Sequence, residues 1–173
     1  MAACGSQSSG SSGTGAAVLA TSTVRPLEET LRAIELADCI VIGPGSVYTS
    51  IVPNLLVRGI PEAIAASDAL KIFVCNVMTQ PGETDGYAAS DHIKAVVKHT
   101  EQKVFQYVLV NDARPSKELL EKYGRQGQYF VEPDISAIRE TGYRPIIGDF
   151  ISQTNVVRHD PEKLANAIVK LIY

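Results

Sequence analysis

The sequence lacks the features that mark disulfide-rich, zinc-binding and membrane-spanning proteins. Its 173 residues include only three cysteines, and none has the C-x-x-C spacing of a metal or redox site. An odd number of cysteines also argues against a disulfide framework. Cys39 and Cys75 lie in apolar runs, so we expect them to pack as small buried hydrophobes. There is no stretch of about 18 apolar residues, which excludes a membrane-spanning helix.

The sequence also has no large excess of positive or negative charge. The net charge is −3, and no block rich in lysine and arginine is present, so the sequence gives no electrostatic reason to expect a nucleic-acid partner. An anionic ligand must therefore be held by local groups. The N-terminus also lacks the basic start and apolar core of a secretory signal. We therefore expect a protein of the reducing cytoplasm.

The chain divides into a leader and one domain. Residues 1–23 are uncharged and rich in Ser, Gly, Ala and Thr, a composition that buries too little apolar surface to offset the entropy of ordering. We predict a flexible leader there. Residues 24–173 are long enough for a single domain with a sizeable core.

Within that domain, apolar runs alternate with amphipathic segments. The predicted strands are 39–42, 71–77 and 105–111, with shorter candidates at 129–131 and 145–147. The predicted helices are 26–34, 54–58, 61–66, 91–99, 117–123 and a last one opening at 161. The expected helix caps are Ser90, Ser116 and Asp160. This alternation predicts a Rossmann-like, three-layer α/β fold with a mostly parallel sheet and helices on both faces. In such sheets, ligands bind beyond the carboxyl ends of the strands.

The first candidate site follows the 39–42 strand. Gly43 and Gly45 permit backbone dihedrals closed to other residues and a close approach of a ligand. The hydroxyls of Ser46, Tyr48 and Thr49 follow them. Together they predict a nest for phosphate oxygens. The alternative is a tight strand-to-helix turn with a hydroxyl cap, since the spacing matches neither a Walker loop nor G-x-G-x-x-G.

The second candidate segment follows the 71–77 strand and is dense in amides, hydroxyls and carboxylates. Asn76 and Gln80 are candidates to contact a base or sugar edge. Asp85 or Asp91 is a candidate to orient His92 or to bind a metal through oxygen. The alternative is helix capping and a solvated carboxylate.

Two further residues lie farther along the chain. Arg158, just before a helix start, either binds a phosphate bidentately or forms a surface ion pair. Tyr123 either packs or offers a stacking surface.

The motifs GPGSVYTSIVPNLLV, CNVMTQPGETDGY, SDHIKAV, YVLVN and VRHDPEKLA occur in this order. From about residue 30 to the C-terminus, the sequence therefore resembles the bacterial gluconeogenesis factor family. That family shares a fold with the 2-phospho-L-lactate transferase of deazaflavin-coenzyme synthesis. The resemblance implies a cytoplasmic protein that binds UDP-sugars and acts in cell shape and in growth on gluconeogenic carbon sources. It also implies that Tyr123 and Arg158 contact the nucleotide-sugar and that the GPGS loop contacts a phosphate or nucleotide.

The sequence departs from this family at its start. Family members are about twice as long and begin with a strand and a GGGTG-type loop, which this chain lacks. We therefore expect the N-terminal part of the sheet to be missing and one strand edge to be exposed, which favours a homo-oligomer.

Three functions follow from these observations. The leading one is a non-catalytic, nucleotide-sugar-binding regulator. The alternative is a transferase that moves a phospholactyl-type group from a nucleotide-activated donor with Mg²⁺, with Asp85 or Asp91 as metal ligand or base. A third is a fragment that binds only a partner chain. No residue is a convincing nucleophile or general base, so the catalytic residues stay unassigned.

Overall fold

The computed structural model describes residues 24–173, and the predicted leader lies outside them. Its main sheet has four parallel strands in the order β1-β2-β3-β4. These strands are β1 (Cys39–Ile42), β2 (Leu70–Val74), β3 (Tyr107–Asn111) and β4 (Arg144–Gly148). Register is set by pairs such as Ile42 with Phe73 and Phe73 with Val108. The parallel sheet predicted from the apolar runs is confirmed, and the short candidate at 145–147 is part of β4.

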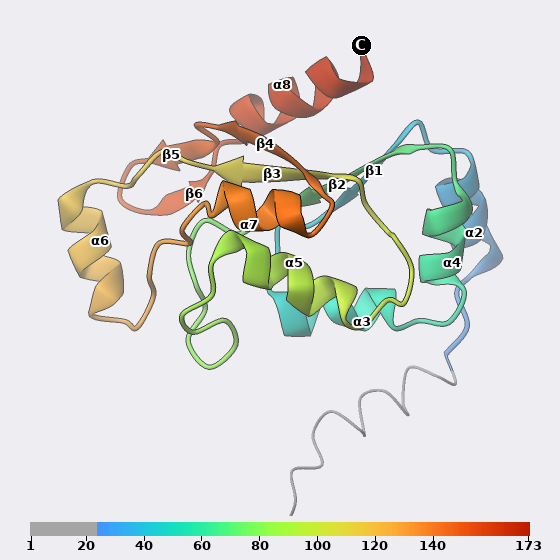
Figure 1. The fold of residues 1–173 in the computed structure, drawn as a ribbon, viewed down its shortest axis with the longest axis horizontal. Coiled ribbons are helices and arrows are strands. Elements are labelled where there is room, and N and C mark those ends of the chain that lie inside the picture. Colours follow the sequence, from blue (N-terminus) through green and yellow to red (C-terminus); the bar gives the residue numbers. More distant parts are fainter. Residues whose placement is uncertain (1–23) are drawn as a thin grey trace, which may run out of the picture.

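Helices cover both faces of this sheet (Figure 1). The C-terminal helix α8 lies on one face, and α3, α5 and α7 lie on the other, with α2 and α4 packed together at one end and α6 at the other. The helices are α2 (Glu28–Glu35), the π-helical turn η1 (Val47–Ile51), α3 (Val52–Leu55), α4 (Ile60–Ala66), α5 (Ala89–Val97), α6 (Lys117–Gly124), α7 (Ile135–Glu140) and α8 (Pro161–Ile172). The predicted Rossmann-like, three-layer arrangement is therefore confirmed. No helix within residues 24–173 is long and apolar enough to cross a bilayer.

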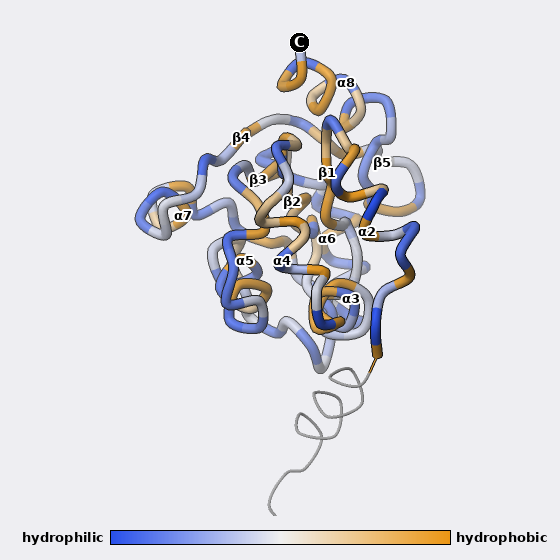
Figure 2. Tube along the Cα trace, turned by 90° about the vertical axis from the view of Figure 1, so that its right-hand side faces the viewer, coloured by the Kyte–Doolittle hydropathy of each residue, from blue (hydrophilic) through white to orange (hydrophobic). Residues whose placement is uncertain are grey.

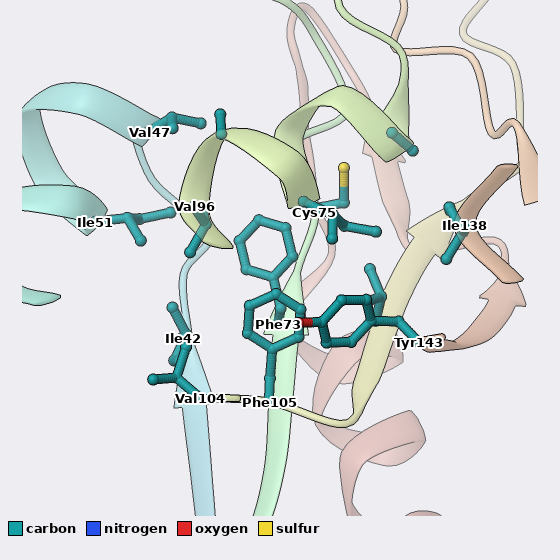
Figure 3. Packing of buried hydrophobic residues seen from close by; sticks show 14 of the residues in the cluster. Ile42, Val47, Ile51, Phe73, Cys75, Val96, Val104, Phe105, Ile138 and Tyr143 are labelled. Atoms are coloured by element: carbon teal, nitrogen blue, oxygen red, sulfur yellow. The ribbon is translucent and has the colours of Figure 1, made fainter. Parts of the chain in front are cut away.

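The larger core lies between the sheet and α5, α7 and η1 (Figure 3). Phe73 and Phe105 stack there with ring centroids 5.2 Å apart, and Tyr143 lies against Phe105 at 4.6 Å. Cys75 is buried in this cluster, as predicted. Cys39 is only half-buried and packs on the α8 face of the sheet.

Two of the three predicted helix caps are confirmed. The Ser116 hydroxyl accepts a hydrogen bond from the Leu119 amide at 3.3 Å, and the Asp160 carboxylate accepts from two amides of the first turn of α8 at 3.0 Å. The cap at Ser90 was wrong, because α5 begins at Ala89 and its N-cap residue is Ala88. Ser90 is buried in the first turn, and its amide donates to the Asp134 carboxylate at 2.8 Å.

Two further predictions at the level of elements need correction. Residues 129–131 do not form a strand, since only Phe130 makes an isolated bridge, to Met78. A two-stranded antiparallel hairpin, β5 (Ile151–Gln153) and β6 (Val157–His159), was not predicted at all. This hairpin carries Arg158 and therefore shapes the candidate site.

The outer edge of β1 has no strand partner within the described part of the chain. Figure 2 colours β1 as mainly hydrophobic, and α2 as a mixture of hydrophilic and hydrophobic residues. Val41 of β1 is 42% exposed, and α2 buries none of its residues completely. The predicted exposed strand edge is therefore confirmed at β1.

Candidate functional site

A cavity of about 400 Å³ lies beyond the carboxyl ends of β1 and β2. Its wall combines the loop after β1, the segment after β2, the end of α6 and strand β6. The lining residues are Pro44, Gly45, Ser46, Asn76, Val77, Met78, Thr79, Gln80, Tyr123, Gln128, Val157, Arg158 and His159. Six of the ten residues predicted for the site are among them, from four segments far apart in the sequence. The structure therefore brings together Gly45, Ser46, Asn76, Gln80, Tyr123 and Arg158.

Gly43 and Gly45 are required for different reasons. Gly43 has a φ of +81°, and a Cβ atom there would lie 3.0 Å from the carbonyl oxygen of Val74. Gly45 does not adopt a positive φ, so the expectation of unusual dihedrals holds for Gly43 alone. A Cβ atom at Gly45 would lie 3.3 Å from the Cβ of Ser50. The loop therefore needs conformational freedom at its first glycine and space at its second.

The Asn76 side chain fixes this loop to the end of β2. Its amide nitrogen donates to the Gly45 carbonyl at 2.8 Å, and its amide oxygen accepts from the Gly45 N–H at 3.3 Å. Both functional groups of the amide are thus engaged by one peptide unit. Asn76 therefore positions the loop and also lines the cavity, where its second amide N–H is left for a ligand.

The loop hydroxyls are engaged by a carboxylate that was not predicted. Ser46 donates to Glu83, and the Ser46 oxygen accepts from the Thr49 amide at 3.2 Å and from the Thr49 hydroxyl at 2.5 Å. Ser46 is therefore fully hydrogen-bonded inside the protein. A phosphate that reaches this part of the loop must compete with the Glu83 carboxylate for the same donors.

Four predicted residues lie outside the cavity wall. Gly43 forms the turn directly after β1. The amide and hydroxyl of Thr49 are hydrogen-bonded to Ser46. The Tyr48 hydroxyl is 2.9 Å from that of Tyr87, and this hydrogen bond, followed by burial, raises the pKa of Tyr48 to about 12. The Asp85 carboxylate accepts from the Gly82 amide at 2.7 Å and closes a turn.

The two carboxylates considered as metal ligands have protein partners in this structure. Asp85 closes its turn, and Asp91 forms an ion pair with Lys94 at 3.1 Å while accepting from the Ala88 amide. Within residues 24–173, no group of three or more His, Cys, Asp or Glu side chains is placed to hold a metal ion. His92 is buried away from the cavity lining, with Nδ1 2.9 Å from the Ala88 carbonyl oxygen, so no aspartate orients its ring by a hydrogen bond.

The side chains of Tyr123 and Arg158 differ in whether they have partners inside the protein. The Tyr123 hydroxyl accepts a hydrogen bond from the Val157 amide at 3.1 Å, and its ring packs in the cluster that contains Val77 and Ile151. Arg158 is exposed in the cavity wall, and its guanidinium has no hydrogen bond or ion pair within residues 24–173. Tyr123 therefore anchors the strand that presents Arg158, and Arg158 is free to bind an anion.

Sequence reasoning missed part of the wall. His159 was not predicted for the site, although it lies in the cavity wall beside Arg158. Burial lowers the pKa of His159, and a hydrogen bond to the Cys75 backbone opposes that shift. Met78, Gln128 and Val157 carried no signal, because nothing in their local sequence indicates that they face a ligand.

Most of the chain is similar in sequence to known proteins. The family model described as "2-phospho-L-lactate transferase CofD" matches residues 8–151. The chain is 45% identical over 147 residues to the "Gluconeogenesis factor" of Halalkalibacterium halodurans, covering 84% of this chain and 46% of that protein. It is 42% identical over 150 residues to the "Gluconeogenesis factor" of Bacillus subtilis, covering 86% and 47%.

A solved structure has the same fold. The crystal structure of a UPF0052 family member from Bacillus halodurans is similar with a TM-score of 0.83 and 44% identity, covering 85% of this chain and 47% of that chain. The chain thus spans about half the length of the curated relatives and of the solved structure that it matches.

Proposed function

The chain belongs to the family of the 2-phospho-L-lactate transferase CofD, and on this basis we propose that its strand-end cavity binds a nucleotide-sugar, namely a UDP-sugar, without catalysis. The observation that carries the proposal is the guanidinium of Arg158, which lies in the cavity wall and has no hydrogen-bond or ion-pair partner among residues 24–173. A guanidinium is a planar fork of donors that matches two phosphate oxygens at once. The net charge of −3 supplies no general attraction for an anion, so this local cation has a decisive part in binding.

The rest of the cavity suits a ligand with an apolar and a polar end. Val77, Met78 and Val157 supply apolar surface, and the amides of Gln80 and Gln128 supply polar groups. A base or sugar ring can pack on the first set while hydroxyls or carbonyls bind the second. The Tyr123 ring, held by its bond to Val157, gives this wall a fixed shape.

The biological role that we propose follows from the relatives. Proteins named gluconeogenesis factor match most of this chain at 42–45% identity. We propose a cytoplasmic regulator that acts in cell shape and in growth on gluconeogenic carbon sources. In this role the UDP-sugar is a signal of metabolic state and is not consumed.

The second candidate is a transferase that moves a phospholactyl-type group from a nucleotide-activated donor with Mg²⁺. It is favoured by the description of the matching family model. Asp85 and Asp91, which we considered as metal ligands, are engaged elsewhere, so we derive no catalytic step through a metal. Turnover of a nucleotide-activated donor in the presence of Mg²⁺ would favour this candidate over the regulator.

Calorimetric titration tests the proposal directly. UDP-glucose, GDP and inorganic phosphate are titrated into the protein with and without Mg²⁺. We expect UDP-glucose to bind more tightly than GDP or phosphate. We expect Arg158→Lys to weaken its binding by about 1–3 kcal/mol, because lysine is a point charge without the planar fork. Arg139→Lys, on the exposed side of α7, is the matched control. If Arg158→Lys binds UDP-glucose as well as the wild type does, Arg158 is not the phosphate contact.

A further inference from the structure

His159 has a fixed position in the wall of the strand-end cavity. It is the last residue of β6 and pairs with Ile151 across the hairpin. At the start of β6, the Val157 amide is bound by the Tyr123 hydroxyl. After its end, the Asp160 amide donates to the Phe150 carbonyl at 2.8 Å, and the Asp160 side chain caps α8. The backbone on both sides of His159 is therefore held.

The imidazole of His159 offers a hydrogen-bond acceptor to the cavity. A neutral imidazole has one N–H donor and one acceptor nitrogen. A hydrogen bond with the Cys75 backbone engages one ring nitrogen, and burial disfavours the charged form of the ring. No residue within 24–173 is seen to bind the other nitrogen. Unlike Nε2 of His92, neither ring nitrogen of His159 is among the buried side-chain atoms without a partner, and the residue lines the cavity.

Acceptors of this kind are scarce in the cavity. The Arg158 guanidinium only donates. The Asn76 amide is bound to Gly45, the Thr79 hydroxyl accepts from the Tyr129 amide, and the Gln80 Oε1 atom is buried without a partner. Among the lining side chains, His159, Gln80 and Gln128 each keep an acceptor atom that no other described residue binds.

We propose that His159 is a specificity-determining residue, whose free ring nitrogen accepts a hydrogen bond from a ligand hydroxyl while Arg158 holds the phosphate. This inference rests on the proposed function of the cavity. The ligand class that satisfies both residues is a phosphate ester that carries a sugar hydroxyl near the phosphate. An analogue without that hydroxyl leaves the His159 nitrogen desolvated and unpaired, which is the situation that sites of this type discriminate against.

The test is calorimetric titration of the wild type, His159→Leu and His159→Gln with UDP-glucose, UDP and 2′,3′-dideoxy-UDP. We expect His159→Leu to weaken UDP-glucose binding about fivefold to tenfold, the loss typical of one hydrogen bond. His159→Gln should retain most of the affinity, because its amide keeps a donor and an acceptor. If the hydroxyl belongs to the ribose, His159→Leu also weakens UDP but leaves dideoxy-UDP unchanged. If it belongs to the hexose, only UDP-glucose is affected.

Several results would overturn the inference. One is equal binding of UDP-glucose by the wild type and a folded His159→Leu. Another is an equal loss for all three probes, which would indicate a general change of shape. Equal affinity of the wild type for all three probes overturns it without any variant. If the wild type binds none of them, the proposed function fails together with the inference. If the wild type binds UDP-glucose and His159→Leu binds it equally well, the inference fails while the proposed function stands.

Discussion

At Gly43, the chain leaves β1 with a φ of +81°, and the space for a side chain is closed by the Val74 carbonyl oxygen 3.0 Å from the ideal Cβ position. Gly82 has a similar φ of +78° but nothing within 4 Å of its Cβ position. Both glycines therefore need a left-handed backbone conformation, but only at Gly43 would a side chain also clash with the backbone.

Alanine variants at these two glycines separate the cost of a strained backbone from the cost of a steric clash. We expect Gly82→Ala to cost about 1–2 kcal/mol of unfolding free energy, the usual penalty for a left-handed L-residue. Gly43→Ala should cost more, because its methyl group also pushes the loop away from β2. Urea unfolding of both variants measures the difference. An equal loss would mean that the loop moves aside at no cost.

The buried His92 predicts a pH dependence of stability. Its side chain is fully buried, and burial lowers its pKa below 6.5, although Asp91 and Asp134 favour the charged form. As pH falls below 6.5, the unfolded chain binds a proton that the folded chain does not. The stability present above this pH is therefore lost on acidification.

We expect the urea midpoint of the wild type to fall between pH 7.5 and pH 5.5, and that of His92→Leu to fall less. His159, whose pKa is also lowered by burial, leaves a residual slope of the same sign. The same pH slope for His92→Leu as for the wild type would show that His92 does not carry the effect.

At the scale of elements, two asparagines bind backbone groups of a nearby loop at the carboxyl ends of the neighbouring strands β2 and β3. Asn76 binds the peptide of Gly45 just after β2, and Asn111 at the end of β3 donates to the Ala113 carbonyl at 2.8 Å and accepts from the Phe150 amide at 3.0 Å. Each replaces backbone pairing where the sheet ends. Only Asn76 touches the loop that lines the cavity.

We therefore expect Asn76→Ala and Asn111→Ala to lower the free energy of unfolding by similar amounts, about 1–3 kcal/mol, because each leaves backbone groups unpaired. Only Asn76→Ala should weaken UDP-glucose binding beyond what the lost stability explains. Thermal unfolding and calorimetry on the same samples compare the two effects. An equal loss of binding in both variants would point to a general loosening of the sheet.

The elements themselves differ in how well the sequence predicts them. β1, β2 and β3 are runs of apolar residues bounded by polar segments, so composition alone indicates buried strands. The β5–β6 hairpin has strands of three residues each, which are too short to show an alternating pattern. Its second strand is bound at Val157 by the Tyr123 hydroxyl, 34 positions away in the chain. A contact between residues so far apart leaves no local signal.

At the scale of the whole molecule, the β1 edge is the surface most suited to self-association. Val41 is 42% exposed beside the unpaired edge, and Leu27 and Leu36 at the two ends of α2 are 71% and 69% exposed. Unpaired strand edges with apolar neighbours are templates for pairing with another chain.

We expect residues 24–173 to self-associate in sedimentation experiments over a concentration series. Val41→Lys should shift the equilibrium toward the monomer, because a charge at the edge opposes pairing. Val169→Lys on helix α8, which is 49% exposed and lies on no strand edge, is the matched control and should have little effect. A wild type that stays monomeric at all concentrations would contradict the prediction.

The sequence by itself determined the parallel sheet, the helices on its faces and the approximate place of the site. These features depend on local patterns: apolar runs, capping residues and the glycines after β1 each signal their structure within a few positions. The tertiary structure decided which candidate residues meet. It made Asn76 a clamp for Gly45 and placed Glu83 on the loop hydroxyls. It also left Arg158 without a side-chain partner among residues 24–173 and brought His159 beside it. Hydrogen-bond partners depend on which groups lie close together in the folded chain. The local sequence around a side chain does not indicate which of several possible partners it will bind.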